Sequence, residues 1–175
     1  MTKCDECGGG PVTTDRQAVI RYDIAGLHHV ELHGVEVTRC EACGYEEIGI
    51  PRLSQLHALL AAMFVKQPRM LAPSEIRFLR KHVGLSSITL AATMGVTRET
   101  VSRWETGANA MSAPTDRLLR MIVLGHQPTD DYIVFEFLQS LEVDPPPDKL
   151  PSVAVHRSHG HGWKANDPPE PAKVG

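Results

Sequence analysis

The 175-residue sequence predicts an α+β fold with two domains and a disordered C-terminal tail. Two Cys-x-x-Cys pairs flank a segment whose apolar residues alternate with period two, and the period becomes helical after residue 52. A stretch rich in Pro, His and Gly, without periodicity, follows Asp144. We therefore expect a small antiparallel β domain at 1–67, an all-α domain of five helices at 68–142, and a disordered tail at 143–175.

The chain has four cysteines, and they form two pairs with the same spacing, Cys4/Cys7 and Cys40/Cys43. Four thiolates in two such pairs match the tetrahedral shell of structural Zn²⁺, so we expect one structural zinc ion per chain. The complete set of thiolates leaves no coordination position open for catalysis. The alternatives are two disulfides or free thiols. They are disfavoured because the N-terminus has no apolar signal-peptide stretch, which indicates a reducing cytoplasm.

The segment at 17–39 shows the alternation of a β-hairpin around an Ala25-Gly26 turn. Its alternating apolar residues are Ile20, Tyr22, Ile24, Val30, Leu32, Val35 and Val37. Three nearby histidines, at 28, 29 and 33, offer an alternative in which one of them replaces a cysteine as zinc ligand. From Arg52 the spacing predicts a helix, which Pro68 prevents from continuing. This helix leads into a linker around residues 66–72.

The segment from 73 to about 141 has the start and stop signals of five short helices. Pro73 suits the first position of a helix, and glycines at 84, 95, 107 and 125 close successive helices. The fifth predicted helix starts at Thr129, with Ile133, Phe137 and Leu141 along one side. We expect the fourth and fifth helices to form the interface of a homodimer.

The net charge of −3 conceals a basic middle segment. Residues 68–126 carry 8 Lys and Arg against 4 Asp and Glu, whereas residues 1–67 carry 6 against 9 and residues 127–175 carry 4 against 8. A partner with phosphate groups is therefore expected to bind the middle of the chain.

The stretch from Leu90 to Gly107 has the layout of a helix-turn-helix, with a three-residue turn that begins at Gly95. Apolar contacts between its helices are expected from Leu90, Ala91, Met94, Val96, Val101 and Trp104. Its second helix presents polar side chains that can reach base edges or phosphates: Arg98, Glu99, Thr100, Ser102 and Arg103. The alternative is an ordinary helical hairpin with a solvated polar face.

Residues 84–107 resemble the Cro/C1-type (XRE) helix-turn-helix family. Together with the two cysteine pairs, residues 1–140 resemble the MqsA-type antitoxins, which carry a YgiT-type zinc finger. The resemblance implies that the zinc domain binds a small ribonuclease toxin. It also implies that the helix-turn-helix domain dimerises on a palindromic DNA operator and represses transcription.

Position by position, the resemblance places the base-facing residues at Arg98, Glu99, Thr100 and Arg103. Further DNA contacts are expected at Ser87, Thr97, Ser102 and Thr106. It also implies a partly buried ion pair between Arg80 and Glu105. The chain departs from the family in having Ser87 where a glutamine is usual and Glu99 where MqsA-type recognition helices have asparagine, so its operator should differ from theirs.

Two other functions compete with that of an antitoxin. A solitary zinc-finger and helix-turn-helix regulator without a toxin has the same sequence features. An enzyme is disfavoured because the chain shows no paired acid and base, no nucleophile motif and no phosphate-binding loop. No run approaches the roughly 20 apolar residues of a membrane span. Because the N-terminus shows no signal-peptide stretch, a cytoplasmic protein is expected. The tail histidines, His156, His159 and His161, suit either weak metal binding or a solvated tail.

Overall fold

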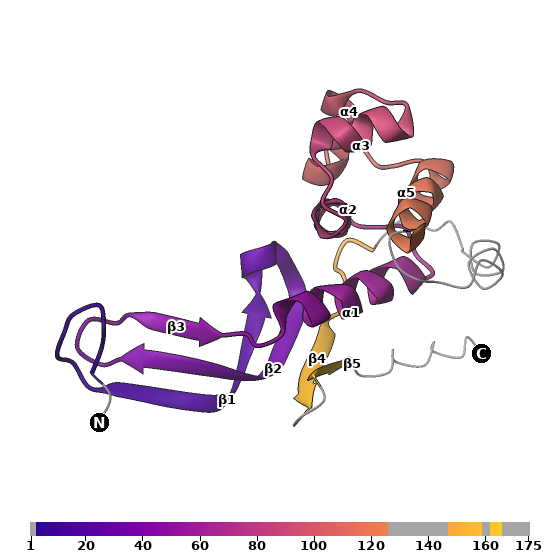
Figure 1. The fold of residues 1–175 in the computed structure, drawn as a ribbon. Coiled ribbons are helices and arrows are strands. Elements are labelled where there is room, and N and C mark those ends of the chain that lie inside the picture. The colour runs from indigo at the N-terminus through magenta and orange to yellow at the C-terminus, as the bar shows by residue number, and fades with distance from the viewer. Residues whose placement is uncertain (1–2, 126–146, 159–161, 166–175) are drawn as a thin grey trace. The chain divides into compact units, whose positions relative to one another are not determined.

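A computed structural model describes residues 3–125, 147–158 and 162–165 of the chain (Figure 1). The chain divides into a sheet unit, residues 1–22, 28–56 and 151–175, and a helical unit, residues 23–27 and 57–150. The boundary predicted at residue 67 is therefore wrong, because most of the helix that precedes it belongs to the helical unit. The sheet unit also takes residues from the predicted tail.

The sheet unit is built on a long hairpin of β1 (Val12–Tyr22) and β2 (Leu27–Cys40), joined by a short 3-10 turn at 23–25. The Thr14 and Thr38 hydroxyls lie 3.2 Å apart, and Arg16 lies 3.3 Å from Glu36. These contacts run in opposite order along the two strands, so the pair is antiparallel. Strand β3 (Glu46–Gly49) pairs antiparallel with the last part of β2.

Strand β2 carries an extra residue at Gly34, which has φ of +74°. Val30 and Leu32 are buried, and so are Val35 and Val37, although a strict period of two would put the second couple on the opposite face. A glycine in the left-handed region absorbs one residue as a β-bulge does, and this returns the later valines to the core face.

The prediction of a disordered tail is wrong for residues 153–158 and 162–165, which form β4 (Val153–Ser158) and β5 (Gly162–Ala165). Strand β4 pairs parallel with β2, from Val30↔Val153 to His33↔His156, and β5 pairs antiparallel with β4 (Figure 1). Val155 is buried, and the buried Trp163 donates a hydrogen bond of 3.0 Å from Nε1 to the carbonyl of Pro51. The apolar partners on the distant strand β2 explain why this short segment becomes a strand.

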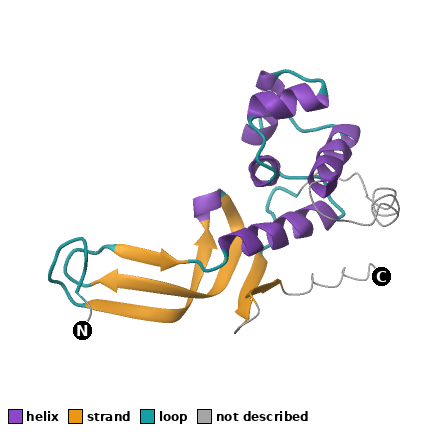
Figure 2. Cartoon of the chain, viewed as in Figure 1, coloured by secondary structure: helices purple, strands orange, loops and turns teal. Residues whose placement is uncertain are grey.

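The helical unit contains α1 (Leu53–Lys66), α2 (Pro73–His82), α3 (Ser87–Met94), α4 (Arg98–Thr106) and α5 (Ala113–Gly125), shown in purple in Figure 2. Its core is apolar, with fully buried residues contributed by each of these helices: Leu60, Phe64, Ile76, Leu79, Leu90, Val101 and Leu119. The fifth helix predicted for the DNA-binding domain, at 129–141, lies outside the described residues. None of the helices in the described part of the chain combines the length and apolar character needed to cross a membrane.

The segment predicted as a linker, 66–72, is held by buried charged side chains. Arg120, 1% exposed, donates to the carbonyls of Val65 at 2.8 Å, Gln67 at 2.7 Å and Arg69 at 2.6 Å. Its Nε also donates to Asp116 at 2.7 Å. The last carbonyls of a helix have no N–H donor within the helix, and here the Arg120 guanidinium supplies it. The connection between α1 and α2 is therefore fixed.

A second buried carboxylate fixes the start of α2. Glu75, fully buried, accepts hydrogen bonds from the backbone N–H of Ala72 at 2.8 Å, from the Gln67 amide at 2.9 Å and from Arg69 at 2.7 and 3.0 Å. A carboxylate in the first turn of a helix satisfies an orphan N–H and complements the helix dipole.

Candidate metal centre and nucleic-acid interface

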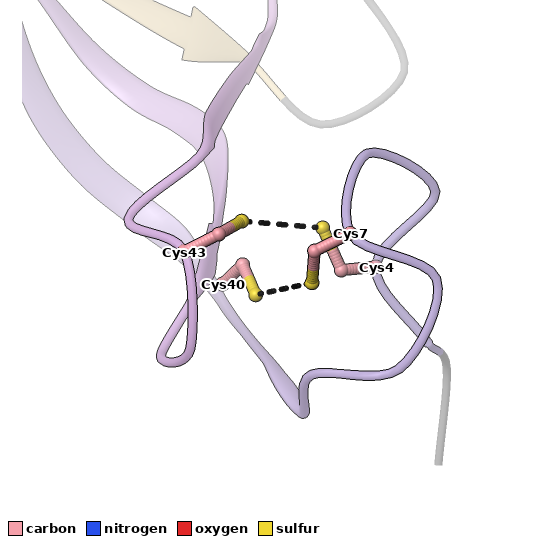
Figure 3. Close-up of side chains that lie close together, drawn as sticks. All are labelled: Cys4, Cys7, Cys40 and Cys43. Carbon is pink, nitrogen blue, oxygen red and sulfur yellow. Dashed lines mark hydrogen bonds between the residues drawn. The ribbon is translucent and has the colours of Figure 1, made fainter.

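The four cysteine sulfurs converge at one end of the sheet unit (Figure 3). Cys4 and Cys7 belong to the loop that precedes β1, Cys40 is the last residue of β2, and Cys43 lies in the turn before β3. The ligand atoms of all four lie within 4.8 Å of one another. Within the described part of the chain, this is the one group of three or more candidate ligand residues gathered this closely.

The two Cys-x-x-Cys turns have the same backbone hydrogen bond. The N–H of Gly8 donates to the carbonyl of Cys4 at 2.9 Å, and the N–H of Gly44 donates to the carbonyl of Cys40 at 3.0 Å. Both glycines follow the second cysteine of their pair and have positive φ, +75° and +72°. Each turn thereby directs two sulfurs to one side, and the glycine accepts a backbone conformation that other residues avoid.

The distances between sulfurs fit a tetrahedral tetrathiolate shell. A metal–sulfur bond of about 2.3 Å at tetrahedral angles places neighbouring sulfurs about 3.8 Å apart. The Sγ atoms of Cys4 and Cys43 are 3.8 Å apart, and those of Cys7 and Cys40 are 3.7 Å apart. A disulfide needs about 2.05 Å, so all four cysteines are free thiols in this geometry. The donor set therefore fits a four-coordinate metal ion.

Gly10 allows the first loop to approach the sulfurs. A Cβ at this position would lie 2.6 Å from the Sγ of Cys40, 2.7 Å from the Cβ of Ala42 and 3.3 Å from the Sγ of Cys7. Any larger residue therefore intrudes on the sulfur cluster. The cysteine spacing does not point to this position, although three consecutive glycines at 8–10 are a local signal of close backbone approach.

The thiols hold their protons unequally. Hydrogen bonds from the backbone N–H groups of Gly9 and Gly10, with a smaller contribution from Cys40, lower the pKa of Cys7 to about 6. At Cys43 the backbone N–H of Tyr45 lowers the pKa, but the hydrogen bond with Cys40, burial and the other two cysteines together outweigh it and raise the pKa to about 12. Cys7 is thus better prepared than Cys43 to bind a metal as a thiolate.

No histidine joins the cluster among the described residues, since its members are the four cysteines alone. His28, His29 and His33 lie in the first half of β2, whereas Cys40 ends that strand. The alternative in which one of them replaces a cysteine as ligand is therefore not supported.

The two helices α3 and α4 pack through small and apolar side chains. Leu90, Ala91, Val101 and Trp104 are buried, whereas Met94 and Val96 are half-buried. Gly95, with φ of +68°, ends α3 in the left-handed region, and the Thr97 hydroxyl accepts a hydrogen bond of 3.2 Å from the N–H of Thr100 to start α4. These caps fix the angle at which α4 leaves the turn.

One side of α4 presents a polar stripe to solvent. Arg98, Glu99, Ser102 and Arg103 are exposed and line one open hollow on the surface. They follow the i, i+3, i+4 spacing of a single helix face. Two arginine guanidiniums and a carboxylate in one stripe can donate to and accept from base edges, which is the chemistry of a recognition helix.

The other predicted DNA contacts lie around this stripe. Thr97 and Thr106 are exposed and Thr100 is half-buried. The Thr106 hydroxyl donates to the carbonyl of Ser102 at 2.9 Å, so it must leave this bond before it can donate to a phosphate. Ser87, half-buried, is the first residue of α3, and Ser86 is the cap, because its hydroxyl accepts the N–H of Thr89 at 3.0 Å.

Arg80 of α2 and Glu105 of α4 form a bidentate ion pair. Their Nε–Oε1 and Nη2–Oε2 distances are 2.5 and 3.0 Å, and their side chains are 11% and 7% exposed. Arg80 also donates to the carbonyl of Leu85 at 2.8 Å, and Arg77 lies 3.6 Å from the same carboxylate. The pair joins α2 to the end of α4.

Comparison with known protein families identifies a domain within the helical unit. Residues 76–123 match the helix-turn-helix family, over α2 to α5. Searches among curated proteins and among solved structures found no match. The chain therefore contains a Cro/C1-type helix-turn-helix domain together with a four-cysteine cluster, and the domain indicates a DNA-binding regulator of transcription.

Proposed function

We propose that this protein is a zinc-stabilised transcriptional repressor that binds a palindromic DNA operator as a homodimer and does no catalysis. The observation that carries the proposal is the exposed stripe of Arg98, Glu99, Ser102 and Arg103 on the second helix of a helix-turn-helix. Arginine recognises guanine O6 and N7 with two hydrogen bonds, and glutamate accepts from cytosine N4. The operator half-site should therefore contain G·C pairs.

Binding-site selection tests the DNA-reading role. Wild type, Arg98→Ala, Glu99→Ala and Arg103→Ala should each select a different motif, with a loss of about 1–3 kcal/mol for each bidentate contact removed. The matched control is Arg16→Ala, an exposed arginine in the sheet unit with a side chain 79% exposed. If all the helix variants select the wild-type motif, direct reading by this stripe is wrong.

The zinc ion holds the sheet unit together in this proposal. The four sulfurs fit a tetrahedral thiolate shell, and a domain this small gains much of its folding free energy from such an ion. Protein purified without chelators should contain one zinc per chain. Iron also suits a tetrahedral thiolate set, so metal analysis that finds iron, or no metal, contradicts the zinc assignment.

The dimer forms through the end of the helical domain. Leu118 and Met121, three residues apart on α5, are both 42% exposed, and this exposed apolar face supports a contact between two copies. The residues predicted to complete the contact, 133, 137 and 141, lie outside the described part. Leu118→Glu together with Met121→Glu should give a monomer in sedimentation velocity and weaken operator binding. A wild type that sediments as a monomer with and without DNA contradicts the dimer.

We further infer that the protein is the antitoxin of a toxin–antitoxin pair, in which the sheet unit binds a small ribonuclease toxin. The combination of the cysteine cluster with a Cro/C1-type domain supports this role, and β1, at the end of the strand order, has an edge for a partner. Purification from the native host tests it, because an antitoxin should carry a small protein with it. Absence of such a protein favours the alternative, a solitary regulator.

A further inference from the structure

Strand β4 places a histidine against a histidine of β2, away from the thiolates. The two strands are parallel, with His33 opposite His156 and Glu31 opposite Ala154. The imidazole centroids of the two histidines are 4.4 Å apart, at an interplanar angle of 35°. Val30, Leu32 and Val155 alternate with these residues and are buried, so the histidines share the opposite, polar face of the sheet.

Both histidines bury a nitrogen that nothing in the described structure satisfies. The Nε2 atoms of His33 and His156 are inaccessible to solvent and have no hydrogen-bond partner. A buried polar atom without a partner destabilises the fold unless something satisfies it. The carboxylate of Glu31 approaches the Nε2 of His33 to 3.6 Å, which is too long for a hydrogen bond. The cluster therefore presents two imidazole nitrogens and a nearby carboxylate on one face of the sheet.

We propose that His33, His156 and Glu31 form a second metal site, selective for divalent transition-metal ions, that fastens β4 to β2. Imidazole nitrogen and carboxylate oxygen are ligands of Zn²⁺, Ni²⁺ and Co²⁺, and water completes the coordination. Binding satisfies both buried nitrogens at once. This second site is distinct from the thiolate site, because it uses a different donor set and a different part of the sheet.

The arrangement also predicts a site weaker than the thiolate site. The ligand atoms of these three residues are not gathered as the four sulfurs are, so at least one of the side chains must turn when the ion binds. Lys164 of β5 lies opposite His156 and is exposed, and its positive charge opposes a cation. Lys164→Gln should therefore tighten metal binding.

The test is a Ni²⁺ titration by calorimetry of the full chain whose thiolates already hold one equivalent of zinc. Wild type should bind one further equivalent, and His33→Asn or His156→Asn should weaken it by about 10–100-fold or more, since even indirect partners of metal ligands matter this much. Glu31→Gln should weaken it less. The matched control is His28→Asn, an exposed histidine on the same strand, which should bind as wild type does.

Two further arms separate this site from simple chelation by the His-rich tail. In the first, a His159→Asn and His161→Asn double variant should still bind the second equivalent of Ni²⁺. In the second, Ni²⁺ should slow amide hydrogen exchange at 153–158 in wild type but not in His156→Asn. Thermal denaturation verifies that the variants fold, and Glu31→Gln provides the test if a histidine variant does not. The proposal is overturned if no second equivalent binds, or if the equivalent survives His156→Asn and disappears with the tail histidines.

Discussion

Replacing Arg120 by methionine should lower the free energy of unfolding of the helical unit by about 4 kcal/mol. The guanidinium, in a residue 1% exposed, donates to backbone carbonyls at the end of α1 and beyond it, and to Asp116, itself 4% exposed. Methionine fills a similar volume but donates nothing. The buried carboxylate is then left without its counter-charge, and breaking such a pair costs about 3–5 kcal/mol.

The unpaired carbonyls add little to the expected loss in the free energy of unfolding. Those of Val65, Gln67 and Arg69 each lose a donor, but water can reach the loosened end of α1 and satisfy them, so the loss of stability stays within the range for the ion pair. In a unit of this size, 1 kcal/mol moves the melting temperature by roughly 4–8 °C. The expected decrease is therefore about 15–30 °C.

Urea denaturation followed by the helical circular dichroism signal measures the change. Arg103→Met is the matched control, because this arginine is exposed on α4, and it should alter stability by no more than about 0.5 kcal/mol. Asp116→Asn and the double variant complete a cycle whose coupling energy isolates the pair. A loss below about 1 kcal/mol for Arg120→Met would refute the view that the buried charges hold the connection between α1 and α2.

Four further predictions concern other parts of the chain. Cys40→Ser should abolish metal binding and unfold the sheet while the helical signal persists, as metal analysis and circular dichroism can show. Arg80→Met should destabilise the helical unit by about 3 kcal/mol in urea denaturation, because its partner carboxylate is buried. Trp163→Ala should destabilise the sheet by about 3 kcal/mol, and hydrogen exchange at 153–158 should accelerate. Zinc affinity should fall as pH falls, since the metal displaces thiol protons, and more steeply below about pH 6, where Cys7 also becomes protonated, as competition with a chelator at several pH values would reveal.

The sequence predicted most reliably those features whose causes are local. The Cys-x-x-Cys turns need only their own residues and a following glycine, and both turns have the same hydrogen bond. The helix-turn-helix is marked by Gly95 and Thr97, which cap its two helices in the structure. In both cases the residues that define the feature lie within a few positions of one another.

The features that the sequence did not predict depend on distant partners. Residues 153–155 read Val-Ala-Val between proline-rich and histidine-rich stretches, and they form a strand because Val30 and Leu32 of β2 lie beside them. The same holds for Arg120, whose partners are carbonyls more than fifty positions earlier in the chain. Composition predicted disorder for residues 153–155 because it does not reveal which surface will cover a short apolar run.

Strand β2 links these local and distant features. Its last residue, Cys40, is a metal ligand, its middle residue, Gly34, keeps the valines in the core, and its earlier part, at 30–33, is where β4 pairs. An ion that binds only the folded sheet stabilises every contact that requires β2 to be formed, by simple mass action. The thiolate site therefore supports the C-terminal strands without touching them. Because β4 follows the helical unit in the chain, the segment that carries the recognition helix begins and ends at strands of the same sheet.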